Sequence, residues 1–248
     1  MISLKSISSL FIKSLSHIQM IIMLYYRPLS YVCIGGIDMD GLTCMKRFEI
    51  HEDYYYAGIK VVSCSLFYPQ LIGHNPALDT LNNQYYLQAI KKKDYCTHVL
   101  YPNAVQAFLQ GSKAFPYEMI VTITLTLQTN EILSFYQQEY LYTGGANGQT
   151  TRIGQTINTF TGQIKHLCDF LMDKKNCETC VKNNIIKQIK TGDDPSLYFD
   201  NYPSLIEETF HPQNFYLTSE GVVVFFTLYD IAPHSTGIPA FLIPYSQC

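Results

Sequence analysis

The sequence predicts an α+β protein in which helices pack against a mostly antiparallel sheet. Stretches with strand periodicity and stretches with helix periodicity both occur in the 248 residues, but they do not alternate regularly. A doubly wound parallel sheet would require regular alternation, so this class is disfavoured. The 20 Tyr and 14 Phe residues add to the expected strand content because aromatic side chains fit pleated sheet surfaces.

The first predicted strand covers residues 54–68, which are rich in Tyr, Val and Ser and show no helical period. Pro69 is expected to end it. A helix should begin at Asn75-Pro76, where Asn suits the N-cap and Pro the first helical position. Apolar residues then follow at helical spacing: Leu78, Leu81, Tyr85 and Ala89. A second helical pattern continues from there to the residues before Gly111.

Residues 119–127 give the clearest pattern in the chain. The odd-numbered positions are all apolar: Met119, Val121, Ile123, Leu125 and Leu127. The even-numbered positions between them hold Ile120, Thr122, Thr124 and Thr126. This period of two predicts a strand with one buried face and one threonine-rich face in water. Residues 128–131 form the expected turn, and residues 132–142 return as the partner strand.

The second half of the chain combines short helices with further strands. A glycine-rich loop at 142–150 precedes a strand at 152–160, and helices are predicted at 168–172, at 178–190 before Gly192, and from Pro203. Three more strands are predicted at 214–218, 222–228 and 238–243. The last of these is bracketed by Pro239 and Pro244, which favours an edge position.

Length and charge limit the classes of function. A chain of 248 residues fits one elaborate domain or two small, intimately packed subdomains. The formal net charge is −3, so no strongly basic field is present and a nucleic-acid partner is not expected. The many tyrosines suit a recognition surface, although tyrosine can also replace Phe and Trp in the core of a sheet.

The N-terminal segment has some features of a secretory signal or membrane anchor. Lys5 and Lys13 precede the apolar run 18–26, but Arg27-Pro28 interrupts the run before a second apolar stretch. We interpret residues 1–45 as a degenerate signal or anchor segment, through which the protein would associate with a membrane. A misassigned start codon and an ordinary packed helix are the alternatives.

Eight cysteines permit full pairing but do not establish it: Cys33, Cys44, Cys64, Cys96, Cys168, Cys177, Cys180 and Cys248. Cys177 and Cys180 form a Cys-x-x-Cys motif that opens a predicted helix, where redox or metal chemistry is conceivable. The motif lacks the second ligand pair of a zinc site and the preceding strand of a redox domain. A local disulfide or two unrelated thiols is therefore favoured, and no metal or cofactor is predicted.

No motif assembles a catalytic site. The glycine-rich loop Gly144–Gly148 lacks a following Lys-Ser/Thr pair and leads into a strand, so it is interpreted as a connection within a sheet. His234 follows Asp230 at a spacing that suggests an acid–histidine pair, but a polar loop residue is the simpler interpretation. Neither a Gly-x-Ser-x-Gly elbow nor a His-Glu-x-x-His motif occurs. The sequence therefore predicts a protein that is not an enzyme.

Three segments carry a resemblance to a known family. Residues 214–241 resemble the C-terminal domain of the DUF3298 family, and residues 142–148 resemble its Gly-Gly-Ala-His-Gly motif, with Asn147 where histidine is usual. Upstream, residues 68–73 and the helix that contains Leu81-Asn82 resemble the companion DUF4163 domain. The resemblance implies a DUF4163-like subdomain at 46–135 and a DUF3298-like subdomain at 136–248.

The same resemblance implies a function. Similar domains are non-catalytic, extracellular or cell-surface binding modules of Gram-positive bacteria, such as the ectodomains of lysozyme-sensing anti-sigma factors of the sigma-V type. A lysozyme-like protein or a cell-wall glycan is the implied partner. The expected ligand-binding residues lie in the two family motifs: Tyr142, Gly144, Gly145, Asn147, Gly148, Tyr229, Pro233 and His234.

Three alternatives remain at this point. Domains of this kind also accompany peptidoglycan deacetylases, so the chain could be an accessory domain of a system that modifies the cell wall. An unrecognised cell-wall hydrolase is the enzymatic alternative, and a structural envelope lipoprotein or spore-associated protein is the third. Residues 1–45 depart from the anti-sigma pattern, since they contain neither a clear sigma-binding segment nor an uninterrupted membrane span.

Overall fold

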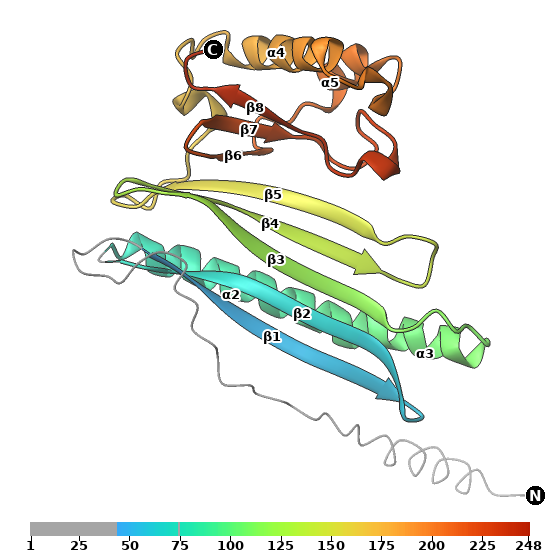
Figure 1. Cartoon of the computed structure of the whole chain (residues 1–248). Coiled ribbons are helices and arrows are strands. Elements are labelled where there is room, and N and C mark those ends of the chain that lie inside the picture. The colour runs from blue at the N-terminus through green and yellow to red at the C-terminus, as the bar shows by residue number, and fades with distance from the viewer. Residues whose placement is uncertain (1–43, 74) are drawn as a thin grey trace, which may run out of the picture.

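A computed structural model describes residues 44–73 and 75–248, which form two sheets and the helices packed on them (Figure 1). The five-stranded sheet has the order β1-β2-β3-β4-β5 and the three-stranded sheet the order β6-β7-β8. The strands are β1 (Cys44–Tyr56), β2 (Ile59–Ile72), β3 (Tyr117–Gln128), β4 (Ile132–Tyr142), β5 (Gln149–Asn158), β6 (Phe215–Leu217), β7 (Gly221–Phe225) and β8 (Ala240–Pro244). The longer helices are α2 (Ala77–Tyr95), α3 (Tyr101–Leu109), α4 (Cys177–Thr191) and α5 (Tyr202–Thr209). All strand pairs are antiparallel except β2–β3, so the predicted α+β class is confirmed.

The first two strands differ from the prediction of a single strand at 54–68. A tight turn at Ala57-Gly58, where both residues have positive φ, divides this stretch into the hairpin β1–β2. Pro69 does not end the strand either. Pairing between β2 and β3 stops at Leu66, so Pro69 has a partner strand on one side only and its missing N–H is tolerated. Within the described residues β1 is an edge strand, and it carries several charged side chains: Lys46, Arg47, Glu49, Glu52 and Asp53.

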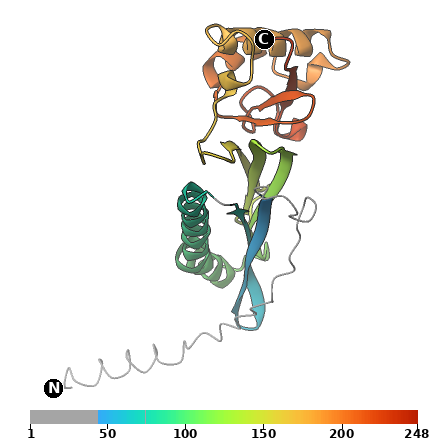
Figure 2. The same cartoon turned by 90° about the vertical axis from the view of Figure 1, so that its left-hand side faces the viewer.

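A continuous helical segment connects the parallel strands β2 and β3. It consists of α2, the π-helical turn η1 (Cys96–Leu100) and α3, and it covers one face of the five-stranded sheet (Figure 2). The helix begins at Ala77 with Pro76 as N-cap, one residue later than predicted. The side-chain oxygen of Asn75 still accepts a hydrogen bond from the backbone N–H of Ala77 at 2.9 Å. The four predicted apolar residues of α2 are all buried: Leu78, Leu81, Tyr85 and Ala89.

The hairpin predicted at 119–142 is confirmed as β3–β4. Val121 and Ile123 are buried beneath the helical segment, whereas Thr122 and Thr124 are exposed on the opposite face. The predicted strand at 152–160 is β5, which pairs with β4 and begins slightly earlier. The glycine-rich loop joins β4 to β5, as the sequence indicated.

The second sheet and its helices form a separate subdomain with its own core. In Figure 1, β6, β7 and β8 lie between the five-stranded sheet and the helices α4 and α5. β8 is an edge strand, as its flanking prolines predicted. β4 and β5 belong to the first sheet, which therefore extends past the boundary predicted between residues 135 and 136. Local periodicity identifies strands but does not tell which sheet a strand joins.

The two subdomains pack closely across one face of β4 and β5. Phe135 contacts Tyr85 of α2, and its neighbours Ser134 and Tyr136 point to the other face, where β6 lies. The rings of Tyr136 and Tyr216 are 5.0 Å apart, and the Arg152 guanidinium lies 4.3 Å from the centre of the Tyr136 ring. These contacts place the short strand β6 directly on the larger sheet.

Ser134 provides a buried polar link across this interface. Its Oγ accepts a hydrogen bond from the backbone N–H of Leu217 at 2.8 Å and lies 2.8 Å from Thr156 Oγ1. In Ser134→Ala we expect a loss of about 2 kcal/mol of unfolding free energy in urea denaturation, because both partners would lose a hydrogen bond in a dry environment. The exposed Thr122→Ala serves as control, with a change within about 0.5 kcal/mol. Equal effects of the two substitutions would contradict the assigned role of Ser134.

The predicted signal or anchor segment at 1–45 lies almost entirely outside the described residues. Within residues 44–73 and 75–248, no helix is both long enough and apolar enough to cross a membrane.

Candidate binding surface at one end of the molecule

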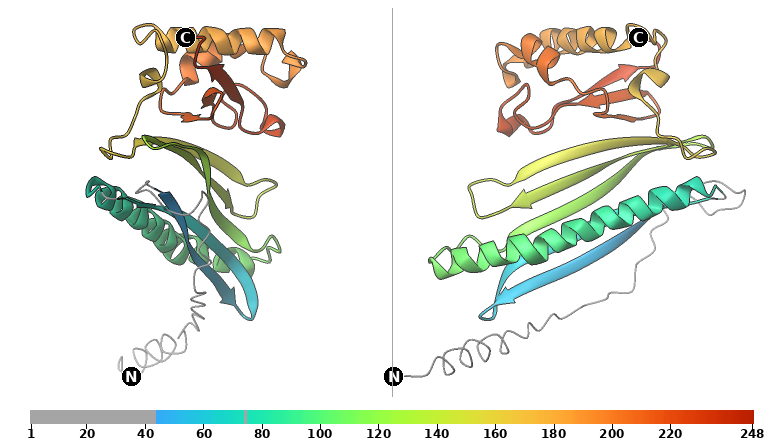
Figure 3. Two further views of the ribbon diagram at one scale, coloured as in Figure 1. Left: turned by 60° about the vertical axis from the view of Figure 1, so that its left-hand side comes forward. Right: turned by 180° about the vertical axis from the view of Figure 1, so that it is seen from behind.

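Four connections between strands gather at one end of the molecule. The pair Val62–Tyr117 places the start of β3 beside β2. The pair Glu118–Tyr142 places the end of β4 beside the start of β3. The end of β7 lies over β5, because the Phe225 ring is 5.6 Å from the Arg152 guanidinium. Figures 1 and 3 show these connections one above another on the same side. We call this surface the loop end; it comprises residues 57–58, 110–116, 143–148 and 226–239 together with the residues that flank them.

Both predicted family motifs lie at the loop end, which sequence separation alone did not imply. The first motif follows Tyr142, a half-buried residue at the end of β4. Gly144 has a φ of +89°, and a Cβ there would lie 2.9 Å from the Tyr117 ring. A Cβ on Gly148 would overlap the ring of Tyr140. These two glycines therefore shape the loop. Of the predicted residues in this motif, Gly145 and Asn147 are exposed, as are their neighbours Thr143 and Ala146.

The second motif holds an aromatic side chain in an unusual backbone conformation. Tyr229 has a φ of +71°, which is rare for a residue with a bulky side chain, and it is 63% exposed. Hydrogen bonds between Thr227 and Asp230 close the turn around it, with the Asp230 carboxylate accepting from the Thr227 N–H at 2.8 Å. The Tyr229 and His234 rings lie 5.6 Å apart. Pro233 is partly buried and directly precedes the short helix η4 (His234–Thr236).

Other exposed apolar side chains flank these motifs and were not predicted as site residues. Tyr55 and Ile59 stand on either side of the β1–β2 turn, and Leu109 ends α3. Leu197 lies beside η4, because its carbonyl accepts a hydrogen bond from Thr236 Oγ1. Recognition of the Tyr-Ala-Gly-Ile turn would have identified the first two. Leu197 could not have been found, since only the fold brings it near residue 236.

Both cysteines of the Cys-x-x-Cys motif form disulfides, and one of these is local, as predicted. Cys177 is bonded to Cys168 and Cys180 to Cys248, so the two cysteines of the motif fasten α4 to two different segments. Cys177 and Cys180 are not bonded to each other. The Cys168–Cys177 bond spans nine positions and is a local disulfide, whereas the Cys180–Cys248 bond spans 68 positions. Among the described residues, no group of three or more His, Cys, Asp or Glu side chains could hold a metal ion.

One polar cluster on the open face of the five-stranded sheet contains serine, histidine and aspartate. Ser63 Oγ donates a hydrogen bond to Asp53 Oδ1 at 2.8 Å, and His51 Nε2 lies 3.7 Å from the same oxygen. Burial raises the pKa of Asp53, but hydrogen bonds from Ser63 and Lys60 and the nearby positive charges outweigh it and lower the pKa overall. Ser63 and His51 both contact the Asp53 carboxylate and not each other. The serine is therefore not activated by the histidine as in a catalytic triad.

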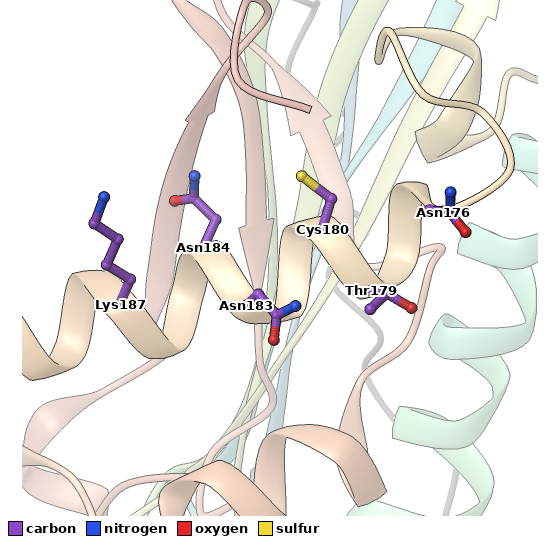
Figure 4. Close-up of a pocket in the computed structure, with 6 residues that line it drawn as sticks. All are labelled: Asn176, Thr179, Cys180, Asn183, Asn184 and Lys187. Carbon is purple, nitrogen blue, oxygen red and sulfur yellow. The ribbon is translucent and has the colours of Figure 1, made fainter.

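A shallow hollow of about 470 Å³ lies along α4. Figure 4 shows that its side chains do not converge: Thr179 and Asn183 point away from the side on which Cys180 and Asn184 lie. Cys180 is bonded to Cys248, and the Asn184 amide donates to Gln247, so both serve to hold the C-terminal segment. The hollow therefore lacks the convergent polar groups that a ligand pocket needs.

The fold by itself defines the structural class of this protein. It is an α+β protein in which the larger sheet, with one βαβ crossover, packs against a smaller subdomain that contains two internal disulfides. Residues 168–246 match the family model described as protein of unknown function DUF3298, and residues 59–150 match the model described as deacetylase PdaC. The predicted family resemblance is confirmed: residues 168–246 are similar to the DUF3298 family.

A comparison with solved structures shows similarity of fold alone. A DUF3298 family member from Bacteroides fragilis is similar with a TM-score of 0.58 and 19% identity, over 83% of this chain and 91% of that one. A DUF3298 family protein from Pseudomonas aeruginosa matches with a TM-score of 0.49 and 17% identity, over 80% of this chain and 90% of that one. None of the curated proteins compared with this chain matches it.

Proposed function

We propose that this chain is a non-catalytic, extracytoplasmic binding module whose ligand contacts the loop end. The observation that carries the proposal is Tyr229, an exposed ring that the fold holds at positive φ and backs with His234. Ala57 also has positive φ, but it belongs to a two-residue hairpin turn that requires this conformation. Tyr229 also lies in a turn, closed by the Asp230 N–H and the Thr227 carbonyl, but Gly or Asn usually occupies a turn position with positive φ. A tyrosine at this position adds backbone strain of the kind that concentrates at functional sites.

The proposed compartment is the cell surface or the extracellular space. Two disulfides lie in the second subdomain, and disulfides persist in oxidising environments such as these. They hold α4 against Cys168 and the C-terminal residue Cys248, so the subdomain that presents Tyr229 is a rigid support. A rigid support lowers the entropy cost of binding. Membrane association through residues 1–45 remains part of the proposal.

The proposed ligand is a lysozyme-like protein or a cell-wall glycan. Tyrosine rings pack on the apolar faces of sugars and on protein side chains alike, while their hydroxyl groups form hydrogen bonds. Tyr229, Tyr55 and the exposed amide of Asn147 offer both kinds of contact at the loop end. A lysozyme is the first partner to test, and soluble peptidoglycan fragments are the second.

Tyr229→Ala tests the proposed surface. We expect ligand affinity to fall about 30-fold, which corresponds to about 2 kcal/mol, because exposed aromatic anchors dominate such interfaces. Alanine is subject to the same backbone conformation, so the melting temperature should change little. Calorimetric titration of wild type and variant with a lysozyme and with peptidoglycan fragments provides the measurement.

Phe160→Ala is the matched control for this experiment. Phe160 is an aromatic residue of similar exposure, 66%, in the connection after β5 at the opposite end of the molecule. Its substitution should leave the affinity unchanged. The proposal is wrong if neither ligand binds the wild-type protein, or if Tyr229→Ala and Phe160→Ala have the same effect on binding.

The match of residues 59–150 to the deacetylase PdaC model favours a second candidate. In this alternative the chain is an accessory domain of a system that modifies peptidoglycan, and it positions a separate catalytic domain on the wall. Insoluble peptidoglycan would then retain the protein in a pull-down experiment, and the protein would not bind lysozyme. Release of acetate or of glycan fragments by the purified chain would instead support the hydrolase reading.

A further inference from the structure

Two cysteines in the core of the first subdomain are in sulfur–sulfur contact. Cys64 lies in the middle of β2 and Cys96 begins the π-helical turn η1, and both side chains are fully buried. Their Sγ atoms are 2.9 Å apart. Met119 of β3, which pairs with Cys64 in the sheet, places its Sδ 3.7 Å from the Cys96 Sγ. The contact joins the sheet to the helical segment that covers it.

The distance between the two sulfur atoms argues against a metal ion between them. Two thiolates that share a tetrahedral zinc ion at about 2.3 Å each would be about 3.8 Å apart. The observed separation of 2.9 Å is closer than that and exceeds a disulfide bond length by only about 0.9 Å. A modest movement of the side chains therefore suffices for bonding, whereas metal binding would require them to separate.

We propose that Cys64 and Cys96 form a third disulfide when the protein folds in an oxidising compartment. Both thiols lose their protons and one S–S bond forms between the two Sγ atoms. The two electrons and two protons pass to a disulfide oxidant, such as oxidised glutathione or a thiol oxidoreductase, which is reduced to two thiols. The bonds Cys168–Cys177 and Cys180–Cys248 depend on the same class of oxidant.

Burial determines when this bond forms. In the closed subdomain no oxidant reaches either sulfur atom, since both residues have 0% exposure. The adjacent Cys96 thiol and burial also raise the pKa of the Cys64 thiol, so its reactive thiolate form is scarce there. The bond therefore forms before the helical segment closes on the sheet, and afterwards it is shielded from reductants. Once formed, it ties together two positions 32 residues apart in the sequence.

Peptide mapping of the full chain tests the proposal directly. The protein is secreted into a bacterial periplasm, and each preparation is used only after its Cys180–Cys248 link is complete. It is then unfolded without reductant, alkylated with iodoacetamide, digested and analysed by mass spectrometry. We expect the Cys64 peptide to be joined to the Cys96 peptide, with neither residue alkylated. Alkylation of both cysteines, or a link from either one to another cysteine, would overturn the proposal.

Alanine variants supply a second, independent readout. Cys64→Ala, Cys96→Ala and the double variant each abolish the same bond, so each should lower the melting temperature by a similar amount, about 10 °C. If the residues were only packed thiols, the double variant would lose more stability than either single variant, because each side chain also contacts other neighbours in the core. A larger loss in the double variant would therefore contradict the proposal. A variant that fails to fold leaves the decision to the peptide map of the wild-type chain.

Discussion

Replacing Gly154 with valine is expected to separate the two sheets and to lower the unfolding free energy by at least about 3 kcal/mol. Gly154 lies on β5, and a Cβ at this position would overlap the carbonyl oxygen and carbon of Phe215 in β6. Both obstructing atoms belong to the backbone, so no side chain can rotate to make room. The second subdomain would have to move away from the first sheet as a whole. Urea denaturation followed by circular dichroism measures the loss.

The form of the transition is a further part of this expectation. If the variant's subdomains no longer stabilise each other, they should unfold in two separate transitions. The wild-type protein should unfold in a single transition. Gly145→Val is the control, because the nearest atom to its Cβ is 3.7 Å away and its φ is not in the left-handed region. A single, unshifted transition for Gly154→Val would show that the close approach of β5 and β6 does not hold the subdomains together.

Removal of the Cys180–Cys248 bond is expected to have the second large effect. The bond joins residues 68 positions apart and so closes a long loop. Without the bond, the conformational entropy of the unfolded chain rises. For the double variant Cys180→Ala/Cys248→Ala we expect a loss of about 4 kcal/mol in denaturant unfolding. The corresponding double variant of Cys168 and Cys177 closes a loop of only 9 positions and should lose less, about 3 kcal/mol. The reverse order would contradict this entropic interpretation.

Most of the elements could be predicted because their signals are local. The alternation from Met119 to Leu127 needs no distant residue to be recognised, and it became β3 with the expected buried and exposed faces. The beginning of β1 was missed because its charged residues suit an edge strand with one open side and give no apolar alternation. The turn at Ala57-Gly58 was missed because it lacks the Asn-Gly or Asp-Gly pair typical of two-residue hairpins.

The candidate site depends on information that is not local. The motifs around Gly144 and His234 could be found by resemblance, but their presence at one end of the molecule follows from strand register and sheet packing. The positive φ of Tyr229 has no sequence signal, since neither glycine nor asparagine occupies the position. The pairing of the cysteines was equally hidden, because spacing alone suggested a local relation between Cys177 and Cys180.

The charged side chains on β1 also bear on how the protein behaves at high concentration. An edge strand of 13 residues, which among the described residues has a partner strand on one side only, offers a template on which the same strand of another molecule could add. Lysine, arginine and acidic residues along β1 make such an addition unfavourable, because each would lose water where like charges meet. The charges on β1 therefore disfavour edge-to-edge assembly through this strand.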